Sequence, residues 1–421
     1  GPDETVTGTA AAKMMLTALG YRADIEGLTG LGWNTNTEVL ANRVELFDGI
    51  TADPDNGMTR DDVAQLIYNG VQADEVAYRN NYGEYSGVIY AQPVNGVDNN
   101  STVLYTRFNV QKVEGVVVAN DIMAIDDGAT TVAGKVRLTD IEYGGSRVDA
   151  DGRVWADQIY TVDMDNSYLG QRVVIYVKGL KDLSPNATSA EVVSEPIISN
   201  DNTVASTTSR LKDVAAVKTF LSGEGLSLPD NIASTGENGT VYYTANDTVI
   251  NTGAPTRNFA VTAAANVAGT ELTFIDHNGD GQVDYIFKTI PTLAKVTVYD
   301  EDDETLTIAG EGAIDFADIA NPEDVAKDDI ILYYQMNETY YLKVAETVSG
   351  EVVSYDNESK KVTVDGNTYG ASTAILEDAS TDMEPFASGD KMDYVGNSYT
   401  FYLDNGGNVI AWVLNEEGLG Q

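Results

Sequence analysis

The chain has 421 residues and a formal net charge of −41, which comes from 66 acidic and 25 basic side chains. A surface with this charge repels nucleic acid and anionic lipid, so neither is an expected partner. The chain has no cysteine and only one histidine, His277. These counts exclude a thiolate nucleophile and a Cys-ligated zinc site, and they almost exclude a Ser-His-Asp relay or a multi-histidine zinc site.

Length and hydropathy set two further bounds. A chain of 421 residues is too long for one ordinary core and favours about three domains. No apolar run reaches about 18 residues, so we expect no membrane insertion. The sequence begins at Gly1-Pro2 without an initiator Met or a signal-like segment. We therefore expect it to be a processed or truncated piece of a longer protein.

The first part of the chain has the residue spacing of three helices. The first is expected over 9–19 with Gly20 as its stop, and the second is expected to end near Gly49. The third has Thr59 as its N-cap, Asp62 three residues later and Gly70 as its stop. The residues expected to face the core are Ala11, Met14, Met15, Ala18 and Leu19, then Leu40, Val44 and Phe47, then Val63, Leu66 and Ile67. Residues 1–78 are thus predicted to form a small helical unit.

From about residue 85 the hydrophobic period changes from helical to alternating. Strands rich in Val, Ile, Thr and Tyr are expected at 88–90, 103–108, 113–118, 132–138, 154–162, 169–177 and 190–198. They predict a β domain over 84–205. A second β domain, over 206–290, is expected to contain a helix at 211–221, strands at 241–243, 247–250 and 258–261, and a hairpin.

The hairpin loop has the spacing of a calcium-binding loop. Asp276, Asn278, Asp280 and Asp284 place side-chain oxygens at loop positions 1, 3, 5 and 9, and the carbonyl of Gln282 falls at position 7. Calcium takes six to eight oxygen ligands, which a short loop with alternating oxygens can supply. Position 12 is Phe287 rather than the Glu of an EF-hand, and both flanks are strand-like. The alternative is a metal-free acidic turn, since Asp, Asn and Gly all favour turns.

The C-terminal part contains an internal repeat. Val296, Val298, Leu306 and Ile308 match Val352, Val353, Val362 and Val364, with an acidic or polar turn inside each set. Further along, residues 331–333 are matched with 392 and 394, and residues 340–344 with 399–403. Two small β modules, 291–347 and 348–415, are therefore predicted in series.

Part of the helical region resembles a known family. Trp33, the segment 46–50 and the run 58–67, which opens Met-Thr-Arg-Asp-Asp, resemble a surface-layer homology (SLH) repeat. Residues 7–13 look like the helix start of a preceding repeat, so about one and a half repeats are present. The resemblance implies anchoring to a secondary cell-wall polysaccharide, with Arg60 contacting the acidic glycan and Thr59 and Trp33 beside it. The earlier repeat has Gly8 where the Arg should stand. The alternative is that Arg60 is a surface residue and Trp33 a core residue.

The segments 275–285 and 352–369 are similar to stretches that follow SLH repeats in clostridial cell-surface proteins. Together the sequence predicts a mainly β chain: a small SLH-like helical unit followed by tandem β-sandwich or barrel-like modules in an extended arrangement. The expected function is a non-enzymatic, extracellular structural protein of surface-layer type, wall-anchored, self-associating and stabilised by structural Ca²⁺.

Two other functions remain open. A surface adhesin or glycan-binding protein would be distinguished by a concave row of exposed tyrosines or tryptophans, which the sequence cannot locate. A carboxylate-based glycan hydrolase has no positive support, because 66 acids bring some pair into range by chance.

Overall fold

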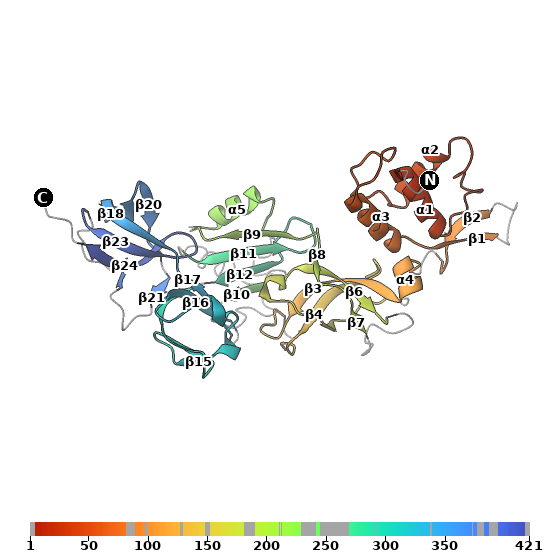
Figure 1. Ribbon diagram of the computed structural model, residues 1–421. Coiled ribbons are helices and arrows are strands. Elements are labelled where there is room, and N and C mark those ends of the chain that lie inside the picture. The colour runs from red at the N-terminus through yellow and green to blue at the C-terminus, as the bar shows by residue number, and fades with distance from the viewer. Residues whose placement is uncertain are drawn as a thin grey trace. The chain divides into compact units, whose positions relative to one another are not determined.

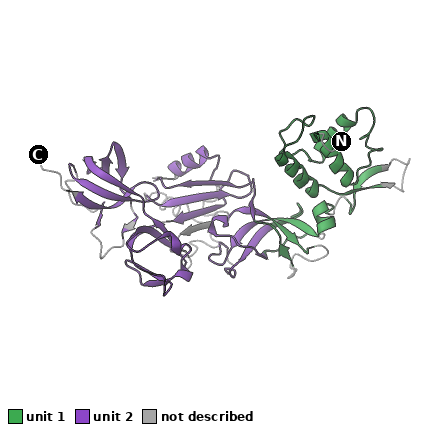
Figure 2. Ribbon diagram, viewed as in Figure 1, with its two compact units in different colours: residues 1–114, 141–158, 175–195 green, residues 115–140, 159–174, 196–421 purple. Residues whose placement is uncertain are grey.

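The computed structural model of the protein is shown in Figure 1. It describes residues 5–80, 89–96, 100–126, 129–147, 152–180, 190–209, 211, 213–228, 241–244, 269–289, 291–336, 339–372, 374–376, 383–386 and 395–416. The chain divides into two compact units (Figure 2). Unit 1 contains residues 1–114, 141–158 and 175–195, and unit 2 contains residues 115–140, 159–174 and 196–421.

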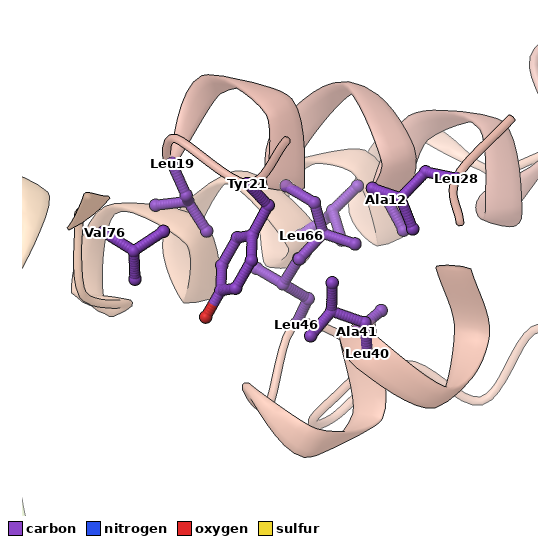
Figure 3. Packing of buried hydrophobic residues seen from close by; sticks show 10 residues of the cluster. Ala12, Leu19, Tyr21, Leu28, Leu40, Ala41, Leu46, Leu66 and Val76 are labelled. Carbon is purple, nitrogen blue, oxygen red and sulfur yellow. The ribbon is translucent and has the colours of Figure 1, made fainter. Parts of the chain in front are cut away.

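Unit 1 begins with three helices packed around one apolar cluster (Figure 3). They are α1 (Gly8–Ala18), α2 (Trp33–Arg43) and α3 (Arg60–Gln72). The buried residues of the cluster are Ala12, Leu16, Leu19, Tyr21, Leu28, Leu40, Ala41, Leu46, Leu66 and Val76. All three expected helices are present, so a small helical unit does open the chain.

The residues that face this core differ in part from the prediction. In α1 the buried apolar side chains are Ala12 and Leu16, whereas Met14 and Ala18 are exposed. In α3 Leu66 is buried as expected, but Val63 and Ile67 are exposed. The apolar residues of each helix form a stripe that is wider than the surface in contact with the other helices. The spacing of apolar residues therefore could not predict which of them are buried.

Two helix ends were also predicted wrongly. α2 ends at Arg43 and is followed by turns, so it does not run to Gly49. Gly70 lies inside α3 and does not stop it. A Cβ at Gly70 would lie 2.4 Å from the Sδ of Met15, so this glycine serves the close approach of α1 and α3.

A two-stranded sheet and a short helix follow in unit 1. The strands β1 (Val76–Asn80) and β2 (Ile89–Pro93) pair antiparallel. Residues 103–108, predicted as a strand, form the helix α4 (Val103–Phe108) instead. Thr102 caps this helix by accepting a hydrogen bond from the amide of Tyr105, and Asn109 ends it with a φ of 56°. These terminal signals outweigh the strand preference of the Val and Tyr residues between them.

A larger sheet has the strand order β5-β4-β3-β6-β7, and β8 also pairs with β6. These strands are β3 (Val110–Ala119), β4 (Lys135–Tyr143), β5 (Gln158–Thr161), β6 (Arg172–Lys178), β7 (Glu191–Val192) and β8 (Ile197–Ile198). The short 3₁₀ helix η1 (Asn166–Tyr168) precedes β6. Every strand expected between residues 113 and 198 has a counterpart here, with ends that shift by a few residues.

The next sheet, in unit 2, has the order β10-β12-β11-β9. Its strands are β9 (Thr203–Thr207), β10 (Val241–Thr244), β11 (Glu271–Asp276) and β12 (Tyr285–Thr289). The expected helix is α5 (Val214–Gly223), whose Val217 and Leu221 pack with Phe274 and Ile286. β9 crosses the domain boundary expected after residue 205. The strands expected at 247–250 and 258–261 lie outside the described residues.

Two modules with the same strand order end the chain. The first is β15-β14-β13-β16-β17 and the second is β20-β19-β18-β23-β24, with β22 beside β24. The first contains β13 (Thr292–Asp300), β14 (Thr305–Ile308), β15 (Ala313–Asp315), β16 (Ile330–Met336), β17 (Thr339–Val344) and the 3₁₀ turns η2 (Phe316–Asp318) and η3 (Pro322–Asp324). The second contains β18 (Thr347–Asp356), β19 (Lys361–Val364), β20 (Asn367–Gly370), β22 (Glu384–Pro385), β23 (Ser398–Leu403) and β24 (Val409–Glu416).

The two modules also agree in local detail. The long strands β13 and β18 each shift register after a buried valine, Val296 or Val352. The carbonyls of these valines accept hydrogen bonds from the amides of Asp328 and Gly396. The pairing shows, however, that β23 corresponds to β16 and β24 to β17. Matching residues 340–344 with 399–403 was therefore wrong, and residues 392 and 394 lie outside the described residues.

The two ends of each strand path come together, as in a small barrel. In the first module Ile319, just after η2, pairs in parallel with Tyr340 of β17. In the second module Ala371, just after β20, pairs in parallel with Val409 of β24. Closure satisfies backbone groups that an open sheet edge would expose.

A buried cluster joins the two modules. It contains Leu293, Leu332 and Ala345 of the first module, and Met383, Ile410 and Ala411 of the second. The short strand β21 (Ile375–Leu376), from the second module's chain segment, also pairs in parallel with β13. The two modules therefore share both a core and a sheet.

The protein is thus mainly β, with several multi-stranded sheets in tandem after a helical unit. Among the described residues, no helix is long and apolar enough to cross a membrane.

Candidate functional site

The predicted calcium loop lies at the tip of a hairpin in unit 2. Its flanking strands β11 and β12 pair antiparallel, and the last pair before the loop is Ile275 with Tyr285. Phe274 and Ile286, which pair with each other, are buried in the core beneath. The hairpin predicted from the sequence is confirmed, and a packed sheet holds both ends of the loop.

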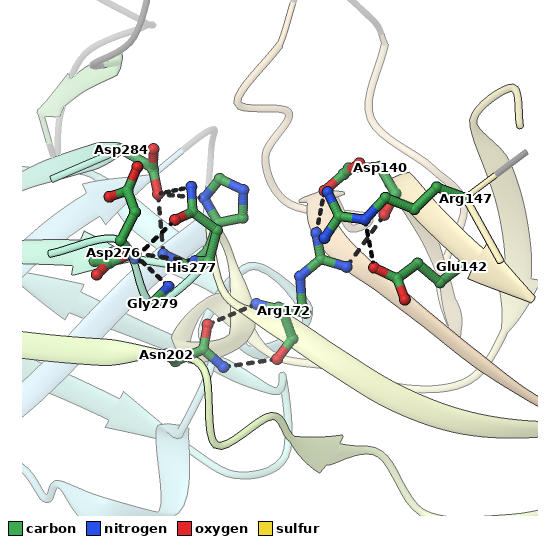
Figure 4. A network of polar contacts seen from close by, with 11 residues as sticks. Asp140, Glu142, Arg147, Arg172, Asn202, Asp276, His277, Gly279 and Asp284 are labelled. Carbon is green, nitrogen blue, oxygen red and sulfur yellow. Dashed lines mark hydrogen bonds and ion pairs between the residues drawn. The ribbon is translucent and has the colours of Figure 1, made fainter. Parts of the chain in front are cut away.

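Asp276 organises the start of the loop. Its side chain is 1 % exposed, and its Oδ1 accepts hydrogen bonds from the amides of Asn278 at 3.0 Å and Gly279 at 2.9 Å. Its Oδ2 accepts another from the amide of Gly281 at 2.8 Å (Figure 4 shows this region). Gly281 has a φ of 78°, which a glycine adopts without strain. The chain therefore wraps around the carboxylate of Asp276.

The next two oxygen-bearing side chains repeat this turn. Asn278 accepts from the amide of Asp280 at 3.0 Å, and Asp280 accepts from the amide of Gln282 at 2.7 Å. Asp276, Asn278 and Asp280 thus each accept a hydrogen bond from the amide two residues later, and the loop consists of three such turns in succession. A turn of this kind is a local device that Asp and Asn side chains supply readily.

Asp284 closes the loop from the other strand. Its Oδ2 accepts a hydrogen bond from the amide of His277 at 3.0 Å and lies 3.5 Å from the Nδ2 of Asn278. The Nδ1 of His277 lies 2.6 Å from the same oxygen, although the ring is not aligned for a hydrogen bond. Figure 4 shows Asp284 close to Asp276 and His277.

A second segment braces the loop from outside. The amide and hydroxyl of Ser227 both donate to the carbonyl of Gly281, at 2.8 and 2.9 Å. The amide of Val283 donates to the carbonyl of Ser227 at 2.9 Å. This bridge uses the backbone groups on either side of Gln282 and does not use the Gln282 carbonyl, which the sequence analysis assigned as a ligand.

The donor set has the chemistry that Ca²⁺ prefers. The three carboxylates of Asp276, Asp280 and Asp284, the amide oxygen of Asn278 and the carbonyl of Gln282 are all hard oxygen donors. Among the described residues, no three Asp, Glu or His side chains by themselves form a group that could hold a metal ion. A cation at this loop would therefore need the amide and carbonyl oxygens as well as the carboxylates, and calcium binding stays a prediction.

We expect calcium to raise the melting temperature of the wild-type chain and Asp280→Ala to abolish that rise. At a free Ca²⁺ concentration 100-fold above Kd, binding adds about 2.7 kcal/mol to stability. The measurement is a thermal melt in Ca²⁺ and in chelator. Asp303→Ala, at an exposed acid of another hairpin, is the matched control and should keep the full calcium response. Equal melting temperatures with and without Ca²⁺ in the wild type would reduce the loop to a metal-free turn.

The second candidate site is the N-terminus of α3. The Thr59 hydroxyl accepts a hydrogen bond from the amide of Asp62 at 3.1 Å and donates to its Oδ2 at 2.7 Å, while the Thr59 amide donates to the same oxygen at 2.9 Å. The hydrogen bonds from Thr59 lower the pKa of Asp62 below its usual value. This capping box confirms the predicted start of the helix. The Thr59 hydroxyl is therefore already engaged in capping.

Arg60 and Trp33 are both first residues of helices, but they lie in different surroundings. Arg60 is exposed, and within the described part of the chain its guanidinium forms no ion pair or hydrogen bond. Trp33 is half-buried, and the cation over its ring is Lys13 of α1, whose Nζ lies 4.8 Å from the ring centroid. Arg60 is thus available to an anionic group, whereas Trp33 already has a cationic neighbour.

Gly8, which occupies the position equivalent to Arg60, has no comparable freedom. Its amide donates to the carbonyl of Asn56, and a Cβ there would lie 3.0 Å from the Cα of Pro54. The start of α1 is therefore packed against the loop that precedes α3. A long side chain at Gly8 would require that loop to move.

A further candidate site, which was not predicted from the sequence, is a hollow of about 620 Å³ in unit 2. Two tyrosines from β16 and β17 line it together with the segment around η1 and the sheet of β9, β11 and β12. The lining residues that matter below are Asp165, Asn166, Gln171, Glu271, Tyr334 and Tyr341. They come from three regions far apart in the sequence, and no local motif marks them.

Comparison of the chain with protein-family models, with curated proteins and with solved structures gives no match.

Proposed function

We propose that the chain is a structural protein of a bacterial cell surface, of the surface-layer type. In this proposal it lies outside the cell, attaches to the wall through its helical unit and associates with copies of itself. Its role is mechanical and not enzymatic. Adhesion through a bound glycan is the alternative function.

The observation that carries the proposal is the repeated C-terminal module. Two modules with the same strand order share a buried cluster and a strand pairing. A buried cluster at the junction between two repeated modules resists bending. Such a junction suits a protein that transmits force along its length. The resemblance of the helical unit to an SLH repeat, with Arg60 exposed at the start of α3, supports wall attachment.

The charge of the chain gives calcium a second role in the proposal. A net charge of −41 makes copies repel one another. Divalent cations screen this repulsion or bridge carboxylates on neighbouring copies, and the Asp276–Asp284 loop would stiffen one hairpin of the array. Assembly should therefore depend on Ca²⁺.

We expect the full chain to assemble at high concentration in millimolar Ca²⁺ and to dissociate in chelator. Light scattering should show at least a doubling of the apparent mass on adding Ca²⁺, and the same ionic strength made with NaCl should not reproduce it. A chain that stays monomeric in Ca²⁺ at high concentration would contradict the self-association part of the proposal.

We expect Arg60→Ala to weaken binding to cell walls that carry an acidic polysaccharide by about tenfold or more, since a guanidinium–carboxylate hydrogen bond is typically worth 1.5–3 kcal/mol. Cosedimentation with purified walls measures the effect. Arg43→Ala, at another exposed arginine of the helical unit, is the control and should bind like the wild type. If Arg60→Ala binds as well as the wild type, Arg60 is an ordinary surface residue.

A further inference from the structure

The hollow in unit 2 has the composition of a small-molecule site. Its volume of about 620 Å³ falls within the range of about 300–1,000 Å³ that is usual for ligand pockets. Apolar residues such as Ile275 and Phe287 line it together with carboxylates, amides and hydroxyls. This mixture of apolar surface and several polar groups is typical of sites that bind an amphipathic ligand.

Two tyrosine rings form one wall. Tyr334 of β16 and Tyr341 of β17 are directly paired across the strands, and their rings stack with centroids 5.0 Å apart and an interplanar angle of 9°. Both side chains are half-buried, so part of each ring stays accessible. Each ring covers part of one face of the other, and an outer face that remains accessible can pack against the C–H face of a sugar ring, which is apolar although the sugar edges are polar.

Hydrogen bonds hold this wall in place. The Nδ2 of Asn166 donates to the hydroxyl of Tyr341 at 2.5 Å. The Oδ1 of Asn166 in turn accepts from the Nδ2 of Asn120, which is buried, at 2.8 Å. The Nε2 of Gln171 donates to the carbonyl of Ser167 at 2.6 Å and so fixes the neighbouring segment. The site is therefore preorganised, which lowers the entropic cost of binding.

Two carboxylates, those of Asp165 and Glu271, are among the acceptors that line the hollow. Glu271 pairs with Thr289 through the backbone at the start of β11, and within the described residues its carboxylate, which lies near Tyr334, makes no hydrogen bond or ion pair. Burial, together with the charge of Glu271, raises the pKa of Tyr334 to about 12, so this hydroxyl stays protonated and can donate. Asp165 accepts from the amide of Ser167 at 2.8 Å through one oxygen, Oδ1.

The charge of the lining selects among sugars. Its two charged side chains, Asp165 and Glu271, are both acidic, and the described lining contains no Lys or Arg. An acidic glycan would meet like charge in a half-buried setting, which is unfavourable. Neutral sugar hydroxyls, by contrast, donate well to carboxylates.

We propose that this hollow is a binding site for an uncharged oligosaccharide, with Tyr334 and Tyr341 as the stacking wall and Glu271 and Asp165 as acceptors of sugar hydroxyls. It differs from the candidate contact at Arg60, which would take an acidic glycan. The inference does not rest on the proposed surface-layer role, because glycan binding and assembly are measured separately.

The test is isothermal titration of the full chain with four tetrasaccharides: cellotetraose, maltotetraose, tetra-N-acetylchitotetraose and the acidic tetragalacturonate. We expect at least one neutral tetramer to bind and tetragalacturonate not to bind. Glu271→Ala should weaken the neutral ligand about tenfold or more. Glu351→Ala removes an exposed carboxylate from a strand outside the hollow and should bind like the wild type.

A second variant covers loss of folding. Tyr341→Phe keeps the ring and removes the hydroxyl that accepts from Asn166. The melting temperature of this variant shows whether it folds, and its affinity for the sugar shows whether the hydrogen bond is needed to orient the ring. We expect Tyr341→Phe to bind several-fold more weakly than the wild type. Three outcomes would overturn the proposal: no neutral tetramer binds, tetragalacturonate binds as tightly as the neutral ligands, or Glu271→Ala binds like Glu351→Ala.

Discussion

Asp140→Asn is expected to lower the free energy of unfolding by about 1.5–3 kcal/mol, because it removes the charge from a hydrogen-bond acceptor of a buried arginine, while the Asp140 side chain itself is 35 % exposed. The side chain of Arg172, at the start of the inner strand β6, is only 1 % exposed. Its Nη2 forms an ion pair with Oδ2 of Asp140, and its Nη1 donates to the Asp140 carbonyl at 3.2 Å (Figure 4). Taking the negative charge away therefore removes one charged partner from a guanidinium that is shielded from water.

The choice of asparagine isolates the charge. Asp140 has a φ of 46°, a left-handed conformation that asparagine adopts more readily than alanine. Asp140→Asn therefore keeps the backbone and the shape, whereas Asp140→Ala would add strain to the loss of charge. Thermal or urea unfolding of the full chain measures the difference.

Replacing Arg172 as well tests whether the buried charge causes the loss of stability. Arg172→Met replaces the buried charge with an apolar side chain of similar length, and such replacements are often neutral or stabilising. The double variant Asp140→Asn/Arg172→Met should therefore be more stable than Asp140→Asn alone. Additive destabilisation in the double variant would show that the charge pair is not the cause.

The parts of this protein that were predictable from its sequence are those whose signal is local. The loop from Asp276 to Asp284 was placed correctly at a hairpin tip, because alternating oxygens and a glycine with positive φ lie within nine residues. Thr59 was recognised as a helix cap for the same reason. The repeat of the C-terminal modules was visible through Val296 and Val352, which occupy the same bulge in each module.

Errors arose where one local preference competed with another. Residues 103–108 are rich in strand-forming side chains, yet Thr102 and Asn109 cap them as a helix. A single-residue capping signal is easily overlooked beside a run of Val and Tyr. The exposure of Met14 shows a related limit, because only tertiary packing decides which part of a wide apolar stripe is covered.

The hollow proposed to bind sugar could not have been predicted. Tyr334 and Tyr341 are strand residues among 24 tyrosines, and Asp165 and Glu271 are two of 66 acids. Their convergence depends on how separate sheets pack together in unit 2. The sequence does contain a weak pointer, since Tyr334 and Tyr341 stand on neighbouring strands of one short hairpin, where a cross-strand pair is expected.

Leu293→Ala is expected to destabilise both C-terminal modules together, by about 2–5 kcal/mol. Leu293 is 0 % exposed and belongs to the cluster that joins the modules, where it lies with Ile410 and Ala411 of the second module. Shortening its side chain leaves a cavity in the joint. Because the modules also share the pairing of β21 with β13, the effect should reach the second module.

Trp412 makes the coupling measurable. It is buried in the core of the second module, so its fluorescence reports unfolding there. The other two tryptophans, Trp33 and Trp155, are replaced by phenylalanine in all variants. Urea unfolding followed at Trp412 should then give a lower midpoint for Leu293→Ala than for the background chain.

The matched control is Leu306→Ala, which removes an equally buried leucine from the core of the first module alone. If the modules unfold as one cooperative unit, this variant also lowers the midpoint seen at Trp412, although no part of the second module has changed. If they unfold independently, Leu306→Ala leaves the Trp412 signal unmoved, and the shared cluster is then too weak to act as a rigid joint. The first result would mean that bending between these modules requires breaking a buried core.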